Sequence, residues 1–316
     1  MQTTNFERAI FFSWYCEIRN CTYCYMSTQS ENKKAVRSKA SLIAELLICK
    51  KLGWEIGFIS GGINAFTQTK FEDTLKAMHE ASQEKFWLNI GALSKQELEK
   101  YLPYTKGVVG SIETVNEKLH KQVCPSKPIE PYLKMFENAL SLGLKTAITI
   151  IIGLGETIGD YPKLAELIRK YKISKIHFYG LNPQKGTSYE NKQPPTEEYQ
   201  AEWIQKTRKE FPEIDIQCGI WADRTERIAT LLKAGANSIS KFPALKKFGA
   251  KEAYEIESQA ELAGRKFIGT LTKLPNTDWN KEVDILNFDK TLKEQIKHKL
   301  TQYLLGMSKK LHKADF

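Results

Sequence analysis

Three cysteines near the start of the chain have the types and spacing to bind iron. Cys16, Cys21 and Cys24 form a C-x4-C-x2-C pattern just after a short apolar run. Thiolates on one loop can hold three corners of an iron–sulfur cubane, because thiolate sulfur is a preferred ligand of iron. A tetrahedral zinc site needs a fourth protein ligand, and the nearest downstream histidine is His79. The pattern therefore predicts one [4Fe–4S] cluster with an open iron; the alternative is a zinc site that borrows a distant ligand.

The remaining cysteines are scattered along the chain. Cys49, Cys124 and Cys218 lie far from one another in the sequence. A disulfide framework is unusual in a long chain that can bury a large core. We therefore expect each to be an ordinary small buried residue, and we do not expect the three to converge on a second site.

The composition is that of an ordinary globular protein. Of the 316 residues, 41% are hydrophobic and 27% are charged. No run approaches the roughly 18 apolar residues of a membrane span. The first residues lack the basic, apolar and small-residue order of a signal peptide. We therefore expect a cytoplasmic protein with no membrane partner.

The chain is basic, with a formal net charge of +10 that comes mostly from lysine. It has 39 lysines and 8 arginines, and the lysines are mixed with glutamates. A protein that reads nucleic acid usually carries more arginine, which makes bidentate contacts. The pattern favours a solvated surface over nucleic-acid binding, and attraction of an anionic ligand is the alternative.

Strand-like and helix-like segments alternate along residues 1–264. The apolar runs carry β-branched and aromatic residues, and several are continuously apolar, as in strands that are buried on both faces of a parallel sheet. This alternation predicts an α/β fold, a (β/α)8 TIM-type barrel. An open doubly wound sheet is the alternative, but no glycine-rich nucleotide loop follows the first strand. The expected strands are 10–15, 55–60, 86–93, 107–112, 146–153, 175–181, 214–221 and 238–242.

Residues 265–316 have a different pattern. Apolar residues recur every three or four positions from Leu292 to Leu311, with lysines between them. This spacing predicts a C-terminal amphipathic helical extension, near residues 289–313, that packs on the barrel away from its catalytic mouth. Docking of this helix to a partner or a membrane surface is the alternative.

The cysteine pattern resembles the motif of the radical S-adenosylmethionine (SAM) enzymes. Most of that superfamily has three residues in the first gap, where this chain has four. The aromatic residue before the last cysteine, which packs near the adenine in the superfamily, is present as Tyr23. The resemblance implies that Cys16, Cys21 and Cys24 hold a cluster that reduces SAM. The products are methionine and a 5′-deoxyadenosyl radical, which takes hydrogen from a substrate.

Other segments resemble the SAM-binding parts of the biotin synthase-like branch. Ser60-Gly61-Gly62 ends the second strand, where that branch binds the SAM amino group with backbone, although Ile63 replaces the usual acidic residue. No arginine lies between residues 37 and 169, so Lys134 or a hydroxyl is expected to hold the SAM carboxylate. The resemblance implies cofactor-binding roles for Tyr23, Ser60, Gly61, Gly62, Glu113, Lys134, Gly153, Leu154 and Gly155.

Within this branch the sequence around the cysteines is most similar to the maturase of the Hmd-type, iron–guanylylpyridinol hydrogenase. This resemblance rests on the longer gap between the first two cysteines and on the sequence from Phe11 to Thr28. It implies a role in biosynthesis of the guanylylpyridinol cofactor. The alternatives are a mutase like methylornithine synthase, a maturase like that of diiron hydrogenase, or an RNA-binding iron–sulfur or zinc protein.

The expected partners are a small-molecule substrate and an electron donor such as reduced flavodoxin or ferredoxin. Barrel enzymes keep their sites at the carboxyl ends of the strands, so polar residues at these ends are substrate-binding candidates. Each of them could equally be a structural side chain. The candidates are Asn64, Asn89, His177, Tyr179, Gln217 and Lys241.

Overall fold

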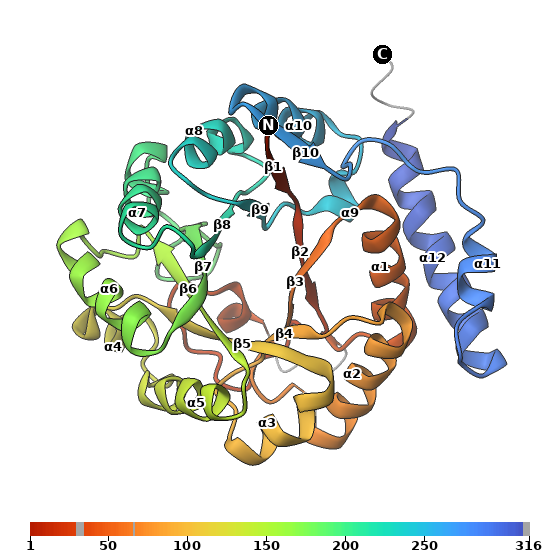
Figure 1. Cartoon of the computed structure of the whole chain (residues 1–316), viewed down its shortest axis with the longest axis horizontal. Helices are drawn as coiled ribbons and strands as arrows, with labels where there is room; N and C mark the ends of the chain where they lie inside the picture. Colours follow the sequence, from red (N-terminus) through yellow and green to blue (C-terminus); the bar gives the residue numbers. More distant parts are fainter. Residues whose placement is uncertain (30–34, 66, 312–316) are drawn as a thin grey trace.

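The chain folds into a ring of parallel strands with helices around its outside (Figure 1). The computed structural model describes residues 1–29, 35–65 and 67–311. Within these residues, eight strands pair in the order β2-β3-β4-β5-β6-β7-β8-β9, each parallel to its neighbour. A parallel bridge from Phe6 to Ile239 brings β9 beside the start of β2, so the sheet nearly closes. The predicted (β/α)8 barrel is confirmed.

The strands agree with the expected positions to within about two residues, except at the first and the third. We expected the first at residues 10–15, but β2 ends at Phe11 because the chain then turns into the cysteine loop. We expected the third at residues 86–93, but β4 ends at Asn89. The barrel strands are β2 (Glu7–Phe11), β3 (Glu55–Ser60), β4 (Phe86–Asn89), β5 (Thr105–Glu113), β6 (Lys145–Ile152), β7 (Ile173–Gly180), β8 (Asp215–Gly219) and β9 (Ser238–Ser240).

Local capping fixes where several helices begin. The side chains of Ser38 and Thr196 each accept a hydrogen bond from a backbone N–H of the first turn, and Ser94 forms a capping box with Glu97. The helices are α1 (Lys39–Leu52), α2 (Gln68–Ser82), α3 (Lys95–Tyr101), α4 (Glu117–Val123), α5 (Glu130–Ser141), α6 (Tyr161–Lys170), α7 (Glu197–Glu210), α8 (Ile228–Lys233), α9 (Ala244–Lys247), α10 (Lys251–Leu262), α11 (Trp279–Asp284) and α12 (Lys290–Leu311).

Successive residues of a strand face opposite sides of the barrel wall. On β6, Ile148 and Ile150 pack in the large core between the sheet and the helices. Their neighbour Ala147 belongs to a smaller cluster inside the barrel, and Ile151 packs against that cluster. The side chain of Thr149, which lies between these two inward residues, therefore also faces the barrel interior.

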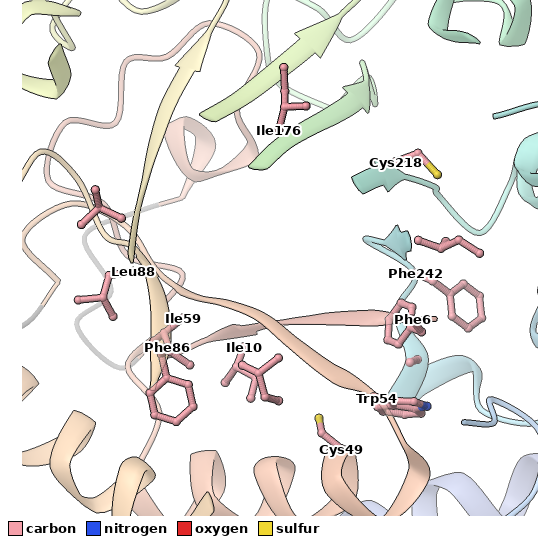
Figure 2. Close-up of a cluster of buried hydrophobic side chains, with 14 of the residues drawn as sticks. Phe6, Ile10, Cys49, Trp54, Ile59, Phe86, Leu88, Ile176, Cys218 and Phe242 are labelled. Atoms are coloured by element: carbon pink, nitrogen blue, oxygen red, sulfur yellow. The ribbon is translucent and has the colours of Figure 1, made fainter. Parts of the chain in front are cut away.

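Three aromatic side chains hold the seam where the sheet nearly closes. Figure 2 shows Phe6, Trp54 and Phe242 together in the core. The ring of Phe6 lies 5.4 Å from that of Trp54 and 6.4 Å from that of Phe242, edge-on in both pairs. These contacts join the chain before β2 to the chain that follows β9.

A buried ionic network fills the amino-terminal end of the barrel. Lys175 Nζ lies 2.7 Å from both Glu7 Oε1 and Asp215 Oδ2. The side chains of Gln217 and Ser238 also donate hydrogen bonds to Glu7. Burial by itself lowers the pKa of Lys175, but the two carboxylates more than offset it, so the pKa lies above its usual value. The charges at this end are therefore paired with one another.

The N-terminal strand pairs with another strand outside the barrel. β1 (Gln2–Asn5) pairs in parallel with β10 (Arg265–Ile268) in a separate two-stranded sheet. The sequence analysis expected neither strand, because both are short and their partners lie more than 260 positions apart. A division of the chain at residue 264 remains a prediction, and the segment after it begins with a strand that is joined to the N-terminus.

Helix α12 lies along α1 on the outside of the ring (Figure 1). Ile296, Leu300 and Met307 are buried, and the Tyr303 hydroxyl lies 2.9 Å from Arg37 Nη2 and 2.7 Å from Ser41 Oγ. Part of the predicted apolar stripe therefore faces the barrel helices; the side chain of Leu311 and residues 312–313 lie outside the described part. Of the helices described, none is long and apolar enough to cross a bilayer.

Replacement of Ile296 by Ala should destabilise the protein. The change removes a fully buried side chain from the α12 interface, which costs about 2–5 kcal/mol. The matched control is Leu305→Ala on the same helix, which should stay within about 0.5 kcal/mol because Leu305 is 57% exposed. Urea unfolding followed by circular dichroism measures both. Equal effects would contradict the packing of α12 on the barrel.

Candidate active site

The loop that carries the three cysteines follows β2 and is fixed to three other segments. The N–H of Glu17 donates to the carbonyl of Ile63, just past β3, at 3.0 Å. The N–H of Thr22 donates to the carbonyl of Val123, the last residue of α4, at 2.9 Å, and the carbonyl of Thr22 accepts from the N–H of Ser188 at 3.0 Å. The end of α4 and the loops that follow β3 and β7 therefore set the position of the thiols.

Two glycines let the cysteine loop lie against the end of β3. A Cβ atom on Gly62 would stand 1.8 Å from the carbonyl oxygen of Tyr15 and 2.5 Å from the Cα of Cys16. One on Gly61 would stand 2.5 Å from the ring of Phe12. Any side chain at either position would push the loop away, so these glycines are required for its approach.

The thiols of Cys16, Cys21 and Cys24 all line one cavity at the carboxyl ends of the strands, with a volume of about 230 Å³. No three metal-binding side chains in the described residues converge on a point where one ion would sit. Three cysteines that line one cavity are the ligand set of a cubane, in which each thiolate binds a different iron. The predicted residues that line the cavity are Cys16, Cys21, Tyr23, Cys24, Ser60, Gly61, Gly62, Asn89, Glu113, Tyr179 and Lys241.

Cys124 lies beside a cysteine of the motif, which the sequence analysis did not expect. It is buried, as predicted, but its thiol shares a hydrogen bond with Cys21. The Thr22–Val123 backbone bond brings the end of α4 to the loop and so joins the two thiols. The hydrogen bond from Cys124 lowers the pKa of Cys21, whereas burial raises the pKa of Cys24 to about 11. Cys124 thus favours the thiolate form of Cys21.

A buried ion pair lies in the wall of the cavity. Lys127 Nζ is 2.5 Å from Glu113 Oε1, and both side chains are at least nine-tenths buried. Burial by itself lowers the pKa of Lys127, but Glu113 more than offsets it, so the pKa lies well above its usual value. Glu113 ends β5 in a left-handed conformation (φ 66°) where the register with β6 shifts. The cavity therefore presents one fixed anion and one fixed cation next to each other.

The structure does not place Lys134 in the cavity, which corrects the sequence analysis. Lys134 lies on the exposed side of α5 and pairs with Glu137 at 2.9 Å. Its side chain is 70% exposed. Helical periodicity sets which residues of α5 face the barrel, and Lys134 faces solvent. Lys127, seven residues earlier in the loop before α5, is the lysine that reaches the cavity.

The loop of Gly153, Leu154 and Gly155 lies behind the cavity wall rather than in it. The N–H groups of both glycines donate to the carboxylate of Glu156, at 2.7 and 3.1 Å. Leu154 packs with Cys124, and Cys21 packs against the same small cluster. In this structure the loop therefore supports the cysteine loop, and contact with adenine remains a prediction.

Three substrate-binding candidates lie away from the cavity surface. Asn64 donates to Glu17 Oε2 at 2.6 Å and braces the cysteine loop. His177 is fully buried, its Nδ1 lies 3.0 Å from the Ile148 carbonyl, and burial lowers its pKa to about 3, so it is neutral. Gln217 belongs to the ionic network around Glu7. These side chains have structural partners, which the sequence pattern does not reveal.

Several further residues line the cavity and were not singled out from the sequence. Lys127, Thr149 and Trp221 are among them. Lys127 follows Cys124 in a loop without periodicity. Thr149 was part of an expected strand, but alternation alone does not tell which of its faces points inward. Trp221 follows β8, and its indole N–H donates to the Gly180 carbonyl at 3.1 Å.

Comparison with known proteins shows the superfamily of this chain. The model of the Radical SAM superfamily matches residues 15–168, which include the cysteine loop and Glu113. An uncharacterized protein of Methanocaldococcus jannaschii is 39% identical over 92% of this chain and 80% of its own length. The chain belongs to the radical SAM superfamily. It is therefore a radical SAM enzyme, with the [4Fe–4S] cluster and SAM as cofactors.

Other radical SAM proteins are more distantly similar. A biotin synthase of Clostridium botulinum is 25% identical over 77% of this chain and 79% of its own length. The crystal structure of methylornithine synthase (PylB) has a TM-score of 0.66 at 19% identity and covers 76% of this chain and 72% of that one. The structure of HydG, a maturase of the [FeFe]-hydrogenase, has a TM-score of 0.68 at 14% identity and covers 96% and 82%. At these identities the two structures support the fold.

Replacement of Gly62 by Ala should displace the cysteine loop. Because the added methyl group would overlap the Tyr15 carbonyl, we expect a loss of about 1–3 kcal/mol in stability and a lower iron content after anaerobic reconstitution. The control is Gly306→Ala in α12, where no atom lies within 4 Å of the new Cβ. It should keep its iron and gain about 0.5–1 kcal/mol. Normal iron content in the Gly62 variant would contradict the role of this contact.

Proposed function

We propose that Cys16, Cys21 and Cys24 hold the cluster and that the adjoining cavity binds SAM together with a small-molecule substrate. The observation that supports this most strongly is the cavity itself, which is lined by the three thiols, the Gly61-Gly62 segment and the Glu113–Lys127 pair. Such groups come from four separate segments of the chain and meet at the carboxyl ends of the strands, where barrel enzymes bind their substrates.

The ion pair suits the amino acid end of SAM. That end carries an ammonium and a carboxylate, and the cavity offers the Glu113 carboxylate and the Lys127 ammonium side by side. Charge-assisted hydrogen bonds of this kind are strong inside a protein. We assign the SAM amino group to Glu113 and the Gly61-Gly62 backbone, and the SAM carboxylate to Lys127 in place of the missing arginine.

The bound cofactors would supply one-electron cleavage of the SAM carbon–sulfur bond and a carbon radical that takes hydrogen from the substrate. The chain's own residues position the reactants and keep water away. Apolar and aromatic side chains, including Phe11, Ile151 and Trp221, form much of the cavity wall. They limit side reactions of a radical with solvent.

For the substrate we propose a precursor of the guanylylpyridinol cofactor of Hmd-type hydrogenase. The long first cysteine gap and the sequence from Phe11 to Thr28 support this choice over a methylornithine synthase-like or diiron-hydrogenase maturase-like role. Membership of an enzyme superfamily gives no support to the RNA-binding alternative. Product analysis by mass spectrometry, with pyridinol precursors and the reconstituted enzyme, tests the choice. Consumption of SAM without conversion of any such precursor would contradict it.

We further propose reduced flavodoxin or ferredoxin as the electron donor. The cysteine loop lies at the surface, and Trp14 beside it is 41% exposed. The net charge of +10 would attract the acidic surface that such carriers usually present.

Replacement of any one of the three motif cysteines by Ala should abolish SAM cleavage. Each variant loses a thiolate that the cluster needs, so reconstituted protein with dithionite and SAM should form no detectable 5′-deoxyadenosine. Cys49→Ala is the matched control, because Cys49 is buried in α1 and does not line the cavity. It should keep the activity. Full activity in the Cys16, Cys21 or Cys24 variant would refute the assignment.

Replacement of Glu113 by Gln should weaken SAM binding about tenfold or more while the cluster still assembles. The variant keeps its size but loses the charge that faces the SAM ammonium, which removes a charge-assisted hydrogen bond. Glu137→Gln is the control, because it changes a Glu–Lys pair that is exposed on α5. Equilibrium dialysis with labelled SAM measures both. Unchanged affinity in the Glu113 variant would place that residue outside the SAM site.

A further inference from the structure

Lys241 is a cavity lysine that lacks an anionic partner. It follows β9, lines the cavity and is partly exposed to it. Among the described residues it has no ion pair and no hydrogen bond from its side chain, whereas Lys127 pairs with Glu113 and Lys175 with Glu7. Of the lysines that line or underlie this cavity in the described chain, Lys241 is therefore the one whose charge is not matched by a carboxylate.

Aromatic rings surround the ammonium of Lys241 instead. Its Nζ lies 4.4 Å from the ring centre of Tyr179, 5.5 Å from that of Phe11 and 5.8 Å from that of Phe58. Ring faces attract a cation, but they compensate for lost hydration less fully than an anion does. Burial lowers the pKa of Lys241 to about 8, which agrees with incomplete compensation.

The backbone of Lys241 is also held in a costly conformation. Its φ angle of 69° lies in the left-handed region that side chains rarely adopt. Strain of this kind is concentrated at functional sites. The strained backbone and the unpaired charge occur at the same residue, and the side chain of that residue lines the cavity.

A second polar group in the same cavity also lacks a partner. Thr149 is 4% exposed and lines the cavity, and its hydroxyl has no hydrogen-bond partner among the described residues. By contrast, the hydroxyl of Thr146 at the start of the same strand donates to the Tyr171 carbonyl at 2.9 Å. Buried hydroxyls are nearly always hydrogen-bonded, so Thr149 indicates a ligand that supplies the missing bond.

The pairing of charges distinguishes the position of Lys241 from the proposed site for the amino acid end of SAM. Glu113 and Lys127 neutralise each other, and Lys127 also acts electrostatically on Cys21. Lys241 follows β9 and lies against Phe11 and Tyr179. Glu113 acts on it electrostatically but is paired with Lys127, so Lys241 has no carboxylate of its own in the cavity. A single carboxylate has the charge to match it, whereas a phosphate group carries about −1.5 to −2 at neutral pH.

We propose that the substrate carries a carboxylate, that Lys241 binds this carboxylate, and that the Thr149 hydroxyl donates a second hydrogen bond to the same ligand. The proposal rests on the function proposed above and specifies its substrate class.

Ligand-observed NMR titration of the reconstituted, SAM-bound enzyme tests this assignment. The probes are two acids with their uncharged amides, benzoate with benzamide and butyrate with butyramide, and inorganic phosphate. We expect each acid to bind about tenfold or more tightly than its amide, the effect of one charge-assisted hydrogen bond. Equal affinity of acid and amide, or a preference for phosphate over both acids, would overturn the proposal.

Substitutions at Lys241 and Thr149 test which residues produce the preference for an acid over its amide. Lys241→Met should abolish the preference for acids, and Lys241→Arg should keep part of it. Lys163→Met, an exposed lysine on α6, should leave it unchanged. Thr149→Val should weaken acid binding about two- to tenfold without removing the preference. A preference that survives Lys241→Met, or unchanged acid binding in Thr149→Val, would contradict the role of that residue.

Two measurements on the same preparations distinguish this proposal from a role of Lys241 in SAM binding and from a failure of the proposed function. SAM affinity should be unchanged in Lys241→Met, and a loss of tenfold or more would instead assign Lys241 to the SAM carboxylate and overturn the proposal. Formation of 5′-deoxyadenosine by the wild type with dithionite reports on the proposed function itself. Wild-type enzyme that cleaves SAM but shows no preference for acids would refute the substrate class alone.

Discussion

The contact between Gly62 and the Tyr15–Cys16 backbone is the constraint on which the site depends. No side chain fits between them, since a Cβ atom would stand 1.8 Å from the Tyr15 carbonyl oxygen. The cysteine loop therefore lies directly on the end of β3, and hydrogen bonds from Glu17 and Thr22 fix it to two neighbouring segments. The three thiols line the barrel mouth because this loop has little freedom to lie elsewhere.

Charge is organised in layers along the barrel. At the amino-terminal end, Glu7 and Lys175 form part of a buried network of paired charges. Above it, His177 is neutral because burial lowers its pKa. At the carboxyl end, the Glu113–Lys127 pair and Lys241 line the cavity. Charges that face the cavity are separated from the floor by uncharged side chains, so a ligand at the mouth meets them in a medium of low polarity.

Two of the charged residues at the mouth are also strained. Glu113 and Lys241 both adopt left-handed backbone conformations, with φ angles of 66° and 69°, at or just past the ends of β5 and β9. Isolated peptides would avoid these conformations. The packed sheet on one side and the fixed loops on the other hold both residues in these conformations. The stability of the barrel thus offsets the backbone strain and keeps both side chains at the same cavity.

The local features of the structure could be predicted from the sequence. Continuous apolar runs and capping residues such as Thr196 predicted the barrel elements, because strand and helix periods are properties of neighbouring residues. The spacing of Cys16, Cys21 and Cys24 predicted the cluster, since these residues are also close together in the sequence. The resemblance of short segments to a known family also brought Gly62 and Glu113 to the site, both of which line the cavity.

The tertiary structure decided which distant residues meet. The partnership of Glu113 with Lys127, the contact of Cys124 with Cys21 and the pairing of β1 with β10 join segments that no local period relates. The tertiary structure also determines which face of a strand points into the barrel. Thr149 lines the cavity while Gln217 belongs to the floor, because barrel closure and strand register, rather than residue type, set the depth of each side chain.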